Sequence, residues 1–121
     1  MSEKLLVREA KRRAEIFANL LRYLKVILDT VRSIDGNAEI YIFGSVTEGR
    51  YVLSSDIDIL VVTDKPPAEV LKALWENGIE DPFEVHVISR DMLKTYVERA
   101  KLIKIEAVSY THLTLPTILL V

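Results

Sequence analysis

The run of residues 56–63, DIDILVVT, constrains the fold of this chain more than any other segment. Its β-branched residues and leucine fall on both faces of an extended chain, which is typical of a strand covered on both sides. Two acids, Asp56 and Asp58, stand at the start of this apolar run. A carboxylate at the start of a buried strand is costly unless a cation compensates its charge, so the same segment also indicates a metal site.

The remaining segments predict an α/β (α+β) fold, in which a small mixed sheet of at least three strands packs against helices. Short β-branched and aromatic runs indicate strands, and apolar residues that recur every three or four positions indicate helices. The first helix is long and amphipathic, and the turn residues Asp35-Gly36-Asn37 end it. In chain order, the expected elements are a helix at 5–31, a strand at 39–43, a short helix at 45–51, a strand at 56–63, a helix at 68–76, a strand at 83–89 and a helix from 91 to about 106.

Length and composition limit the class of protein. With 121 residues, of which 50% are hydrophobic, the chain can bury one core but not two. It has no cysteine, which excludes disulfides, thiolate metal sites and cysteine nucleophiles. The first residues are too charged for a signal peptide, and no apolar run reaches the roughly 18 residues of a membrane span. A cytoplasmic protein without a membrane partner is therefore expected.

The segment 107–121, AVSYTHLTLPTILLV, carries no Asp, Glu, Lys or Arg and differs sharply from what precedes it. It resembles translated adapter or read-through sequence of the SYTHLTLPT type, which leaves residues 1–106 as a single domain. The alternative is a short genuine strand, in which Pro116 would favour an edge position. No function is assigned to His112.

Three acids can supply a metal site. Asp56 and Asp58 are two positions apart, so on a strand both carboxylates leave the same face, at most about 7 Å apart along the strand. Hard ions such as Mg²⁺ take one or two carboxylates together with water and substrate phosphate. Glu84 can reach the same metal if its strand lies beside residues 56–63. His86 shares the strand face of Glu84 and is interpreted as a structural or rim histidine.

The dipeptide Gly44-Ser45 follows the expected strand at 39–43 and can supply a phosphate site. Glycine lets the backbone approach a ligand closely, and a helix that begins at Ser45 would direct its first N–H groups at an anion. A turn for phosphate followed by carboxylates for metal is an order that phosphoryl transfer can use.

The order Gly44-Ser45, ten residues, then Asp56-x-Asp58 resembles the GS-x10-DxD signature of the minimal nucleotidyltransferases. These are small prokaryotic members of the DNA polymerase β-like superfamily. The resemblance implies the polymerase β-like nucleotidyltransferase fold, with residues 38–106 as the catalytic core and residues 1–35 as a long N-terminal helix before it.

The segment between the turn and the acids partly follows the family pattern. Gly49 falls where the family usually has a second glycine, and Ser55 precedes the first aspartate as in the family's common SDID form. Relatives often read G-S-R-x-R-G, whereas Val46 and Glu48 replace those arginines here. Arg50 is then the arginine of this segment, and the resemblance groups it with Ser55 among the phosphate-binding residues.

The resemblance implies transfer of a nucleoside monophosphate from a triphosphate, commonly ATP, to a hydroxyl, with two Mg²⁺ ions assisting and pyrophosphate leaving. By the same resemblance, Gly44 and Ser45 hold the β- and γ-phosphates, and Asp56 and Asp58 ligate the metals. The third family carboxylate follows a V-[DE]-[LV] type context, which matches Phe83-Glu84-Val85. Glu84 would complete the acceptor-side metal and help to activate the nucleophile.

The resemblance also implies a partner. Family members of this size often work beside a HEPN-domain protein as the antitoxin of a toxin–antitoxin pair, and some add AMP to a tyrosine of the toxin. A chain this short has no room for a separate acceptor-recognition domain, so a HEPN-domain protein or another protein acceptor is expected. The long N-terminal helix is the candidate contact surface. A homo-oligomer stays open, and a nucleic-acid partner is not expected because an aromatic-rich basic groove is missing.

Two alternative functions remain. The altered phosphate segment is compatible with a non-catalytic module that keeps the fold and neutralises a partner by contact alone. Transfer to RNA or to a small antibiotic-like acceptor is a weaker hypothesis, since the sequence offers no recognisable acceptor pocket.

Overall fold

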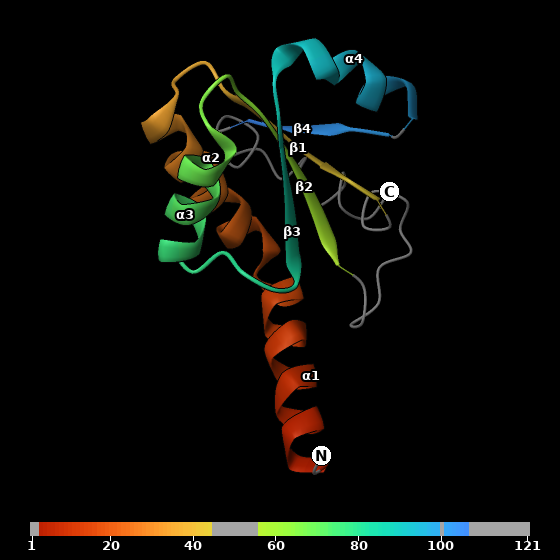
Figure 1. Ribbon diagram of the computed structural model, residues 1–121. Coiled ribbons are helices and arrows are strands. Elements are labelled where there is room, and N and C mark those ends of the chain that lie inside the picture. Colours follow the sequence, from red (N-terminus) through yellow and green to blue (C-terminus); the bar gives the residue numbers. More distant parts are fainter. Residues whose placement is uncertain (1–2, 45–55, 100, 107–121) are drawn as a thin grey trace.

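The apolar runs expected to be strands form one mixed sheet in the computed structural model, which describes residues 3–44, 56–99 and 101–106 (Figure 1). The α/β (α+β) class is therefore confirmed. The short helix expected at 45–51 and the segment 107–121 lie outside the described residues. In chain order the elements are α1 (Glu3–Ala18), α2 (Leu20–Ile34), β1 (Glu39–Phe43), β2 (Ile57–Val62), α3 (Pro67–Glu76), β3 (Phe83–Ile88), α4 (Arg90–Arg99) and β4 (Ile103–Ile105).

The order of strands across the sheet is β3-β2-β1-β4. Strand β2 runs parallel to β3 and antiparallel to β1, and β1 is antiparallel to β4. The central position of β2 explains its sequence, because five of its six residues are buried and only Asp58 is partly exposed. The prediction that this strand is covered on both sides is confirmed.

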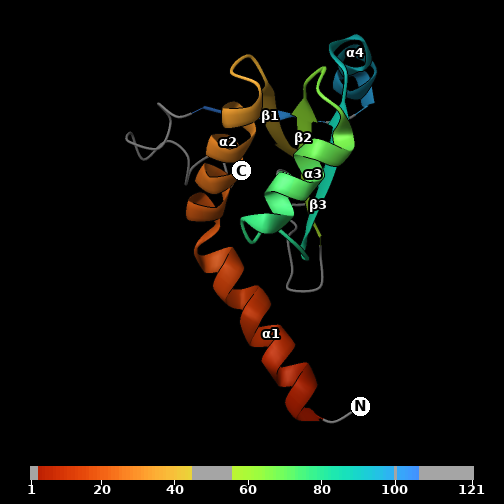
Figure 2. The same cartoon turned by 60° about the vertical axis from the view of Figure 1, so that its left-hand side comes forward.

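Helices α2 and α3 cover one face of the sheet (Figure 2). The buried residues of α2 recur every three or four positions and therefore form one stripe that faces the sheet. They are Leu20, Leu24, Ile27, Leu28 and Val31. The alternating residues Ile40 and Ile42 of β1 point into the same core, whereas Tyr41 and Phe43 face the opposite side. That opposite side carries the polar residues of β2 and β3.

The end of the fold differs from the sequence prediction. The last helix ends at Arg99, and Ile103–Ile105 form the edge strand β4 where a helix to about residue 106 is expected. Ile103 and Ile105 lie opposite Ile42 and Ile40 of β1, and Ile105 is fully buried. The helical expectation is wrong because pairing with a strand sixty residues away outweighs the local apolar spacing.

The N-terminal helix is also not continuous. Asn19 separates α1 from α2, with φ −114° and ψ 27°. Its backbone N–H donates to the carbonyls of both Glu15 and Ile16, at 3.0 and 3.1 Å, and its side-chain amide donates to the Glu15 carbonyl at 2.9 Å. Asparagine competes with the helix for its own backbone in this way, which accounts for a break that leaves the apolar spacing intact.

Helix α1 projects away from the sheet and its covering helices in both ribbon views (Figures 1 and 2). Its first turns are exposed, including Leu5, Leu6 and Val7. Near its other end, the Arg13 guanidinium lies 2.8 Å from the Asp81 carboxylate, which stands just before β3. Within the described ranges, no helix is both long enough and apolar enough to cross a bilayer.

Candidate active site

Asp58 and Glu84 are direct partners across the parallel pair β2–β3. Side chains alternate along a strand, so His86, two residues after Glu84, shares this face of the sheet. Leu60, the β2 partner of His86, is fully buried beside it on the same face. The register therefore brings Asp58 together with Glu84 and His86, which lie far from it in the sequence.

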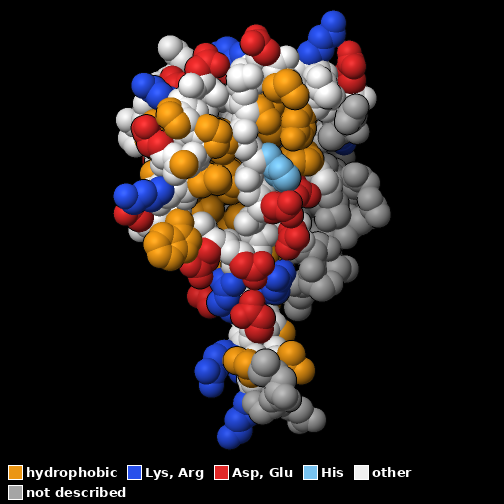
Figure 3. All heavy atoms as spheres, in the orientation of Figure 1, with side chains coloured by type: hydrophobic (Ala, Val, Ile, Leu, Met, Phe, Trp, Pro, Cys, Tyr) orange, Lys and Arg blue, Asp and Glu red, His pale blue; other side chains and the backbone are white. Residues whose placement is uncertain are grey.

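The three polar side chains form a tight group. The His86 Nε2 atom lies 3.5 Å from Glu84 Oε1 and 3.7 Å from Asp58 Oδ1. One ligand atom from each residue falls within 4.8 Å of the other two. Asp58 is 25% exposed and His86 32%, whereas Glu84 is 52% exposed, so the group opens to solvent on the Glu84 side. Figure 3 shows the histidine above a group of acidic side chains on this surface.

Asp58 has the most perturbed environment of the three. Burial raises the pKa of its carboxyl, the neighbouring His86 partly opposes this shift, and Asp56 adds to it by charge repulsion. Asp56 itself is exposed and lies just before β2, outside the group of three. The structure thus brings Asp58 together with Glu84 and His86, and the expectation that Asp56 shares the metal site stays a prediction.

Gly44 adjoins the same carboxylate. Its φ is +85°, a conformation that L residues with a Cβ rarely adopt. A Cβ at this position would overlap the Oδ2 atom of Asp58 and lie 3.3 Å from its Cγ. Gly44 therefore leaves room for the Asp58 carboxylate, and its approach to a phosphate stays a prediction.

An aromatic pair borders the group. Phe43 ends β1 opposite Asp58, and its ring centroid lies 5.5 Å from that of His86 and 6.2 Å from that of Tyr96 on α4. Sequence reasoning assigned no role to Phe43 or Tyr96. For Phe43, the sequence signal was its position directly before Gly44. A strand that ends at a ligand-binding turn places its last side chain beside the ligand.

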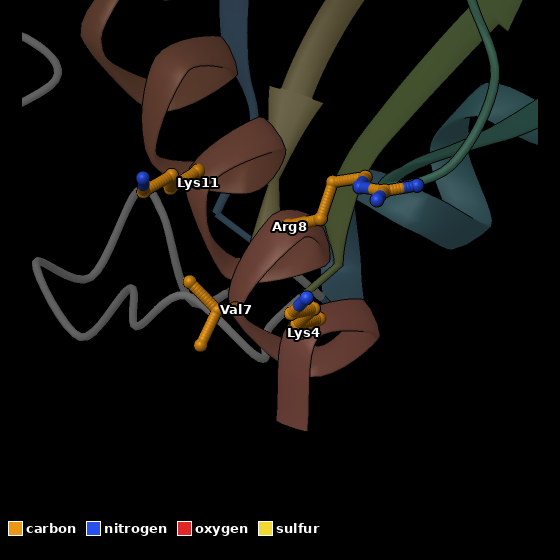
Figure 4. Close-up of a pocket in the computed structure, with 4 residues that line it drawn as sticks. All are labelled: Lys4, Val7, Arg8 and Lys11. Atoms are coloured by element: carbon orange, nitrogen blue, oxygen red, sulfur yellow. The ribbon is translucent and has the colours of Figure 1, made fainter. Parts of the chain in front are cut away.

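The other predicted phosphate-site residues, Ser45, Arg50 and Ser55, lie outside the described residues. Their roles stay predictions. A separate hollow lies on α1, lined by Lys4, Val7, Arg8 and Lys11 (Figure 4). None of its described lining residues is a carboxylate.

The donor atoms of the group fit a divalent cation. Carboxylate oxygens bind Mg²⁺ and Mn²⁺, and a neutral imidazole nitrogen binds transition metals. Ligands that share one ion with bonds of about 2.1 Å must lie within about 4.2 Å of one another. The two distances from His86 Nε2, 3.5 and 3.7 Å, satisfy this limit, and all three ligand atoms lie within 4.8 Å of one another.

Comparison with known proteins identifies the family. The sequence model of the nucleotidyltransferase domain matches residues 24–113. The chain belongs to the nucleotidyltransferase domain family. It is thus a nucleotidyltransferase, as the Gly-Ser and Asp-x-Asp motifs predicted. The match begins within α2, so α1 precedes the matched segment, and it runs past Glu106 into the tail.

Solved structures agree with this assignment. A crystal structure of a candidate nucleotidyltransferase is similar with a TM-score of 0.58 at 28% identity, over 68% of this chain and 96% of that chain. A second, from Sulfolobus solfataricus, is also described as a candidate nucleotidyltransferase. It gives a TM-score of 0.54 at 26% identity, over 74% of this chain and 84% of that chain. The predicted nucleotidyltransferase fold is confirmed.

Proposed function

We propose that this nucleotidyltransferase transfers AMP from ATP to a hydroxyl of a protein partner in the cytoplasm, with Mg²⁺ held at the Asp58 and Glu84 carboxylates. The observation that carries the proposal is the pairing of these two acids across β2 and β3, beside Gly44. Asp56, exposed next to them, is the proposed further carboxylate for a second Mg²⁺ ion. Two such ions would neutralise the triphosphate and the pyrophosphate that leaves.

Each residue of the site has a distinct task in this proposal. The partly buried Asp58 holds metal in a fixed place, since Gly44 and the sheet register define the position of its carboxylate. Glu84 is half exposed and can meet an acceptor hydroxyl from solvent. It would accept the hydroxyl proton as the oxygen attacks the α-phosphorus, while the bond to pyrophosphate breaks. Gly44 and Ser45 with Arg50 and Ser55 are the proposed phosphate-binding residues.

The proposed acceptor is a HEPN-domain protein, which the nucleotidyltransferase would silence as its antitoxin. Support comes from α1, which projects from the body and exposes Leu5, Leu6 and Val7 together. Exposed apolar side chains on one helix are typical of a protein contact. The flanking basic residues Lys4 and Arg8 would favour an acidic partner surface.

The experiment is incorporation of label from α-labelled ATP into a HEPN-domain protein, with Mg²⁺ present. Wild type should label the partner, and Asp58→Asn and Glu84→Gln should each reduce labelling by at least about a hundredfold. Asp64→Asn is the matched control, because Asp64 is an exposed acid just beyond the other end of β2. Labelling that survives both site substitutions would refute catalysis at this group.

A second set of variants tests the partner surface. Leu5→Ser with Leu6→Ser should abolish labelling of the partner and capture of the partner, while metal binding stays as in wild type. If the partner is instead neutralised equally well by Asp58→Asn, contact alone is sufficient and the non-catalytic alternative is correct.

A further inference from the structure

We propose that His86 is a direct ligand of the metal at this site, and that its imidazole makes the site prefer Mn²⁺ to Mg²⁺ more strongly than carboxylates alone would. The inference rests on the proposed metal site at Asp58 and Glu84. It adds a third ligand that the sequence motif does not contain.

The distances allow His86 to share one ion with each carboxylate. His86 Nε2 lies 3.5 Å from Glu84 Oε1 and 3.7 Å from Asp58 Oδ1. A well-formed N–H···O bond is about 2.7–3.2 Å long, so both separations are longer than such a bond. Two ligands of one ion with bonds of about 2.1 Å lie at most about 4.2 Å apart, and both separations are below that limit. The His86 Nε2 atom is therefore within reach of an ion held by either carboxylate.

The surroundings hold the imidazole in this place. His86 lies in the middle of β3, and its ring contacts Phe43 at a centroid distance of 5.5 Å. Phe43 is in turn held by Tyr96 of α4. Two thirds of the His86 side chain are covered. A ligand fixed before the ion binds loses little freedom on binding.

The donor set of two carboxylates and one imidazole discriminates between metals. Mg²⁺ is a hard ion that takes oxygen ligands and keeps several waters, so an imidazole adds little to its affinity. Mn²⁺ accepts carboxylate and water like Mg²⁺. As a first-row transition metal, Mn²⁺ also binds an imidazole nitrogen more readily than Mg²⁺ does. Removal of the His86 ring should therefore weaken Mn²⁺ more than Mg²⁺.

The test measures binding of Mn²⁺ alone and of Mg²⁺ alone to the full chain, without nucleotide. His86→Gln should weaken Mn²⁺ binding at least about tenfold, a loss seen even for residues that only support a ligand, and weaken Mg²⁺ binding less than about threefold. His112→Gln, at the chain's other histidine, is the matched control and should leave both affinities unchanged. Pulsed electron paramagnetic resonance of the wild type with bound Mn²⁺ should detect one coupled imidazole nitrogen, and this measurement needs no variant of the site.

The proposal is overturned if no nitrogen couples to bound Mn²⁺, or if His86→Gln changes both affinities by the same factor. Asp58→Asn separates this failure from failure of the proposed function. If Asp58→Asn abolishes binding of both metals while His86→Gln changes neither, the carboxylate site stands and the histidine ligand does not. If Asp58→Asn binds both metals as wild type does, the metal site itself is misplaced.

Discussion

Substitution of Gly44 by alanine tests how closely the backbone and the candidate active site are coupled. The residue has φ +85°, and the new methyl group would overlap Oδ2 of Asp58. Gly78, which follows α3, is a matched control because its φ is +86° and nothing lies within 4 Å of a Cβ built there. The two variants share the backbone penalty, and only one of them displaces the carboxylate.

The expected magnitudes follow from this difference. An alanine forced into the left-handed region costs about 1–2 kcal/mol, which should appear in both variants. In Gly44→Ala the Asp58 side chain must also leave its rotamer, for about 0.5–1.5 kcal/mol more. A catalytic carboxylate displaced by about 1 Å can cost about a hundredfold in rate. Gly44→Ala should therefore lose metal affinity and activity, whereas Gly78→Ala should lose only stability.

The assay combines denaturant unfolding with metal titration, and a double-mutant cycle isolates the contact. In an Asp58→Ala background the overlapping carboxylate is gone, so Gly44→Ala should destabilise by no more than Gly78→Ala does. Equal destabilisation by Gly44→Ala with and without Asp58, together with unchanged metal affinity, would refute the proposed coupling.

Three further substitutions probe charge and anchoring. Burial raises the pKa of Asp58, so ionisation of this carboxyl lowers the stability of the folded state as pH rises through that pKa. Metal-free Asp58→Asn should therefore have a higher Tm than wild type at pH 7. An equal or lower Tm would contradict this. The Thr63 hydroxyl donates to the Asp35 carboxylate at 2.6 Å and lowers the pKa of that carboxyl. Thr63→Val should therefore lower Tm at neutral pH. The difference in Tm between this variant and wild type should disappear as pH falls below the usual aspartate range of about 4. Asp81→Ala removes the ion pairs to α1 and should lower the free energy of unfolding in urea by up to about 1 kcal/mol. The control Asp29→Ala breaks an exposed ion pair within α2 and should lower it by about 0.3 kcal/mol. Equal losses of unfolding free energy would show that α1 is not anchored at Asp81.

Local pattern was sufficient for most of the fold. The strand at 39–43 has the predicted bounds, and the helix at 68–76 differs from Pro67–Glu76 by one residue. Both are framed by turn residues whose backbone preferences are local, such as Gly78 at φ +86°. The motif likewise predicts Asp58 and Glu84 as site residues without knowledge of how their strands pair.

The errors arose where distant parts of the chain decide the outcome. β4 is three residues long, and its sequence Ile-Lys-Ile fits a helix or a strand, so only its pairing with β1 selects between them. Asn19 breaks the helix by local hydrogen bonds that leave the apolar stripe in register on both sides. The contact of His86 with Asp58 depends on the β2–β3 register, which no spacing within the motif encodes.

The register also explains why the two halves of the motif stand together. Phe43 lies opposite Asp58 in the antiparallel pair β1–β2, so Gly44 reaches the Asp58 carboxylate whatever path the chain takes between them. Loop length affects closure entropy only slowly, whereas a slip of one residue in pairing would turn Asp58 to the apolar face. The parallel pair β2–β3 then adds Glu84 and His86 to the same face. The position of the candidate metal ligands is therefore a property of three paired strands.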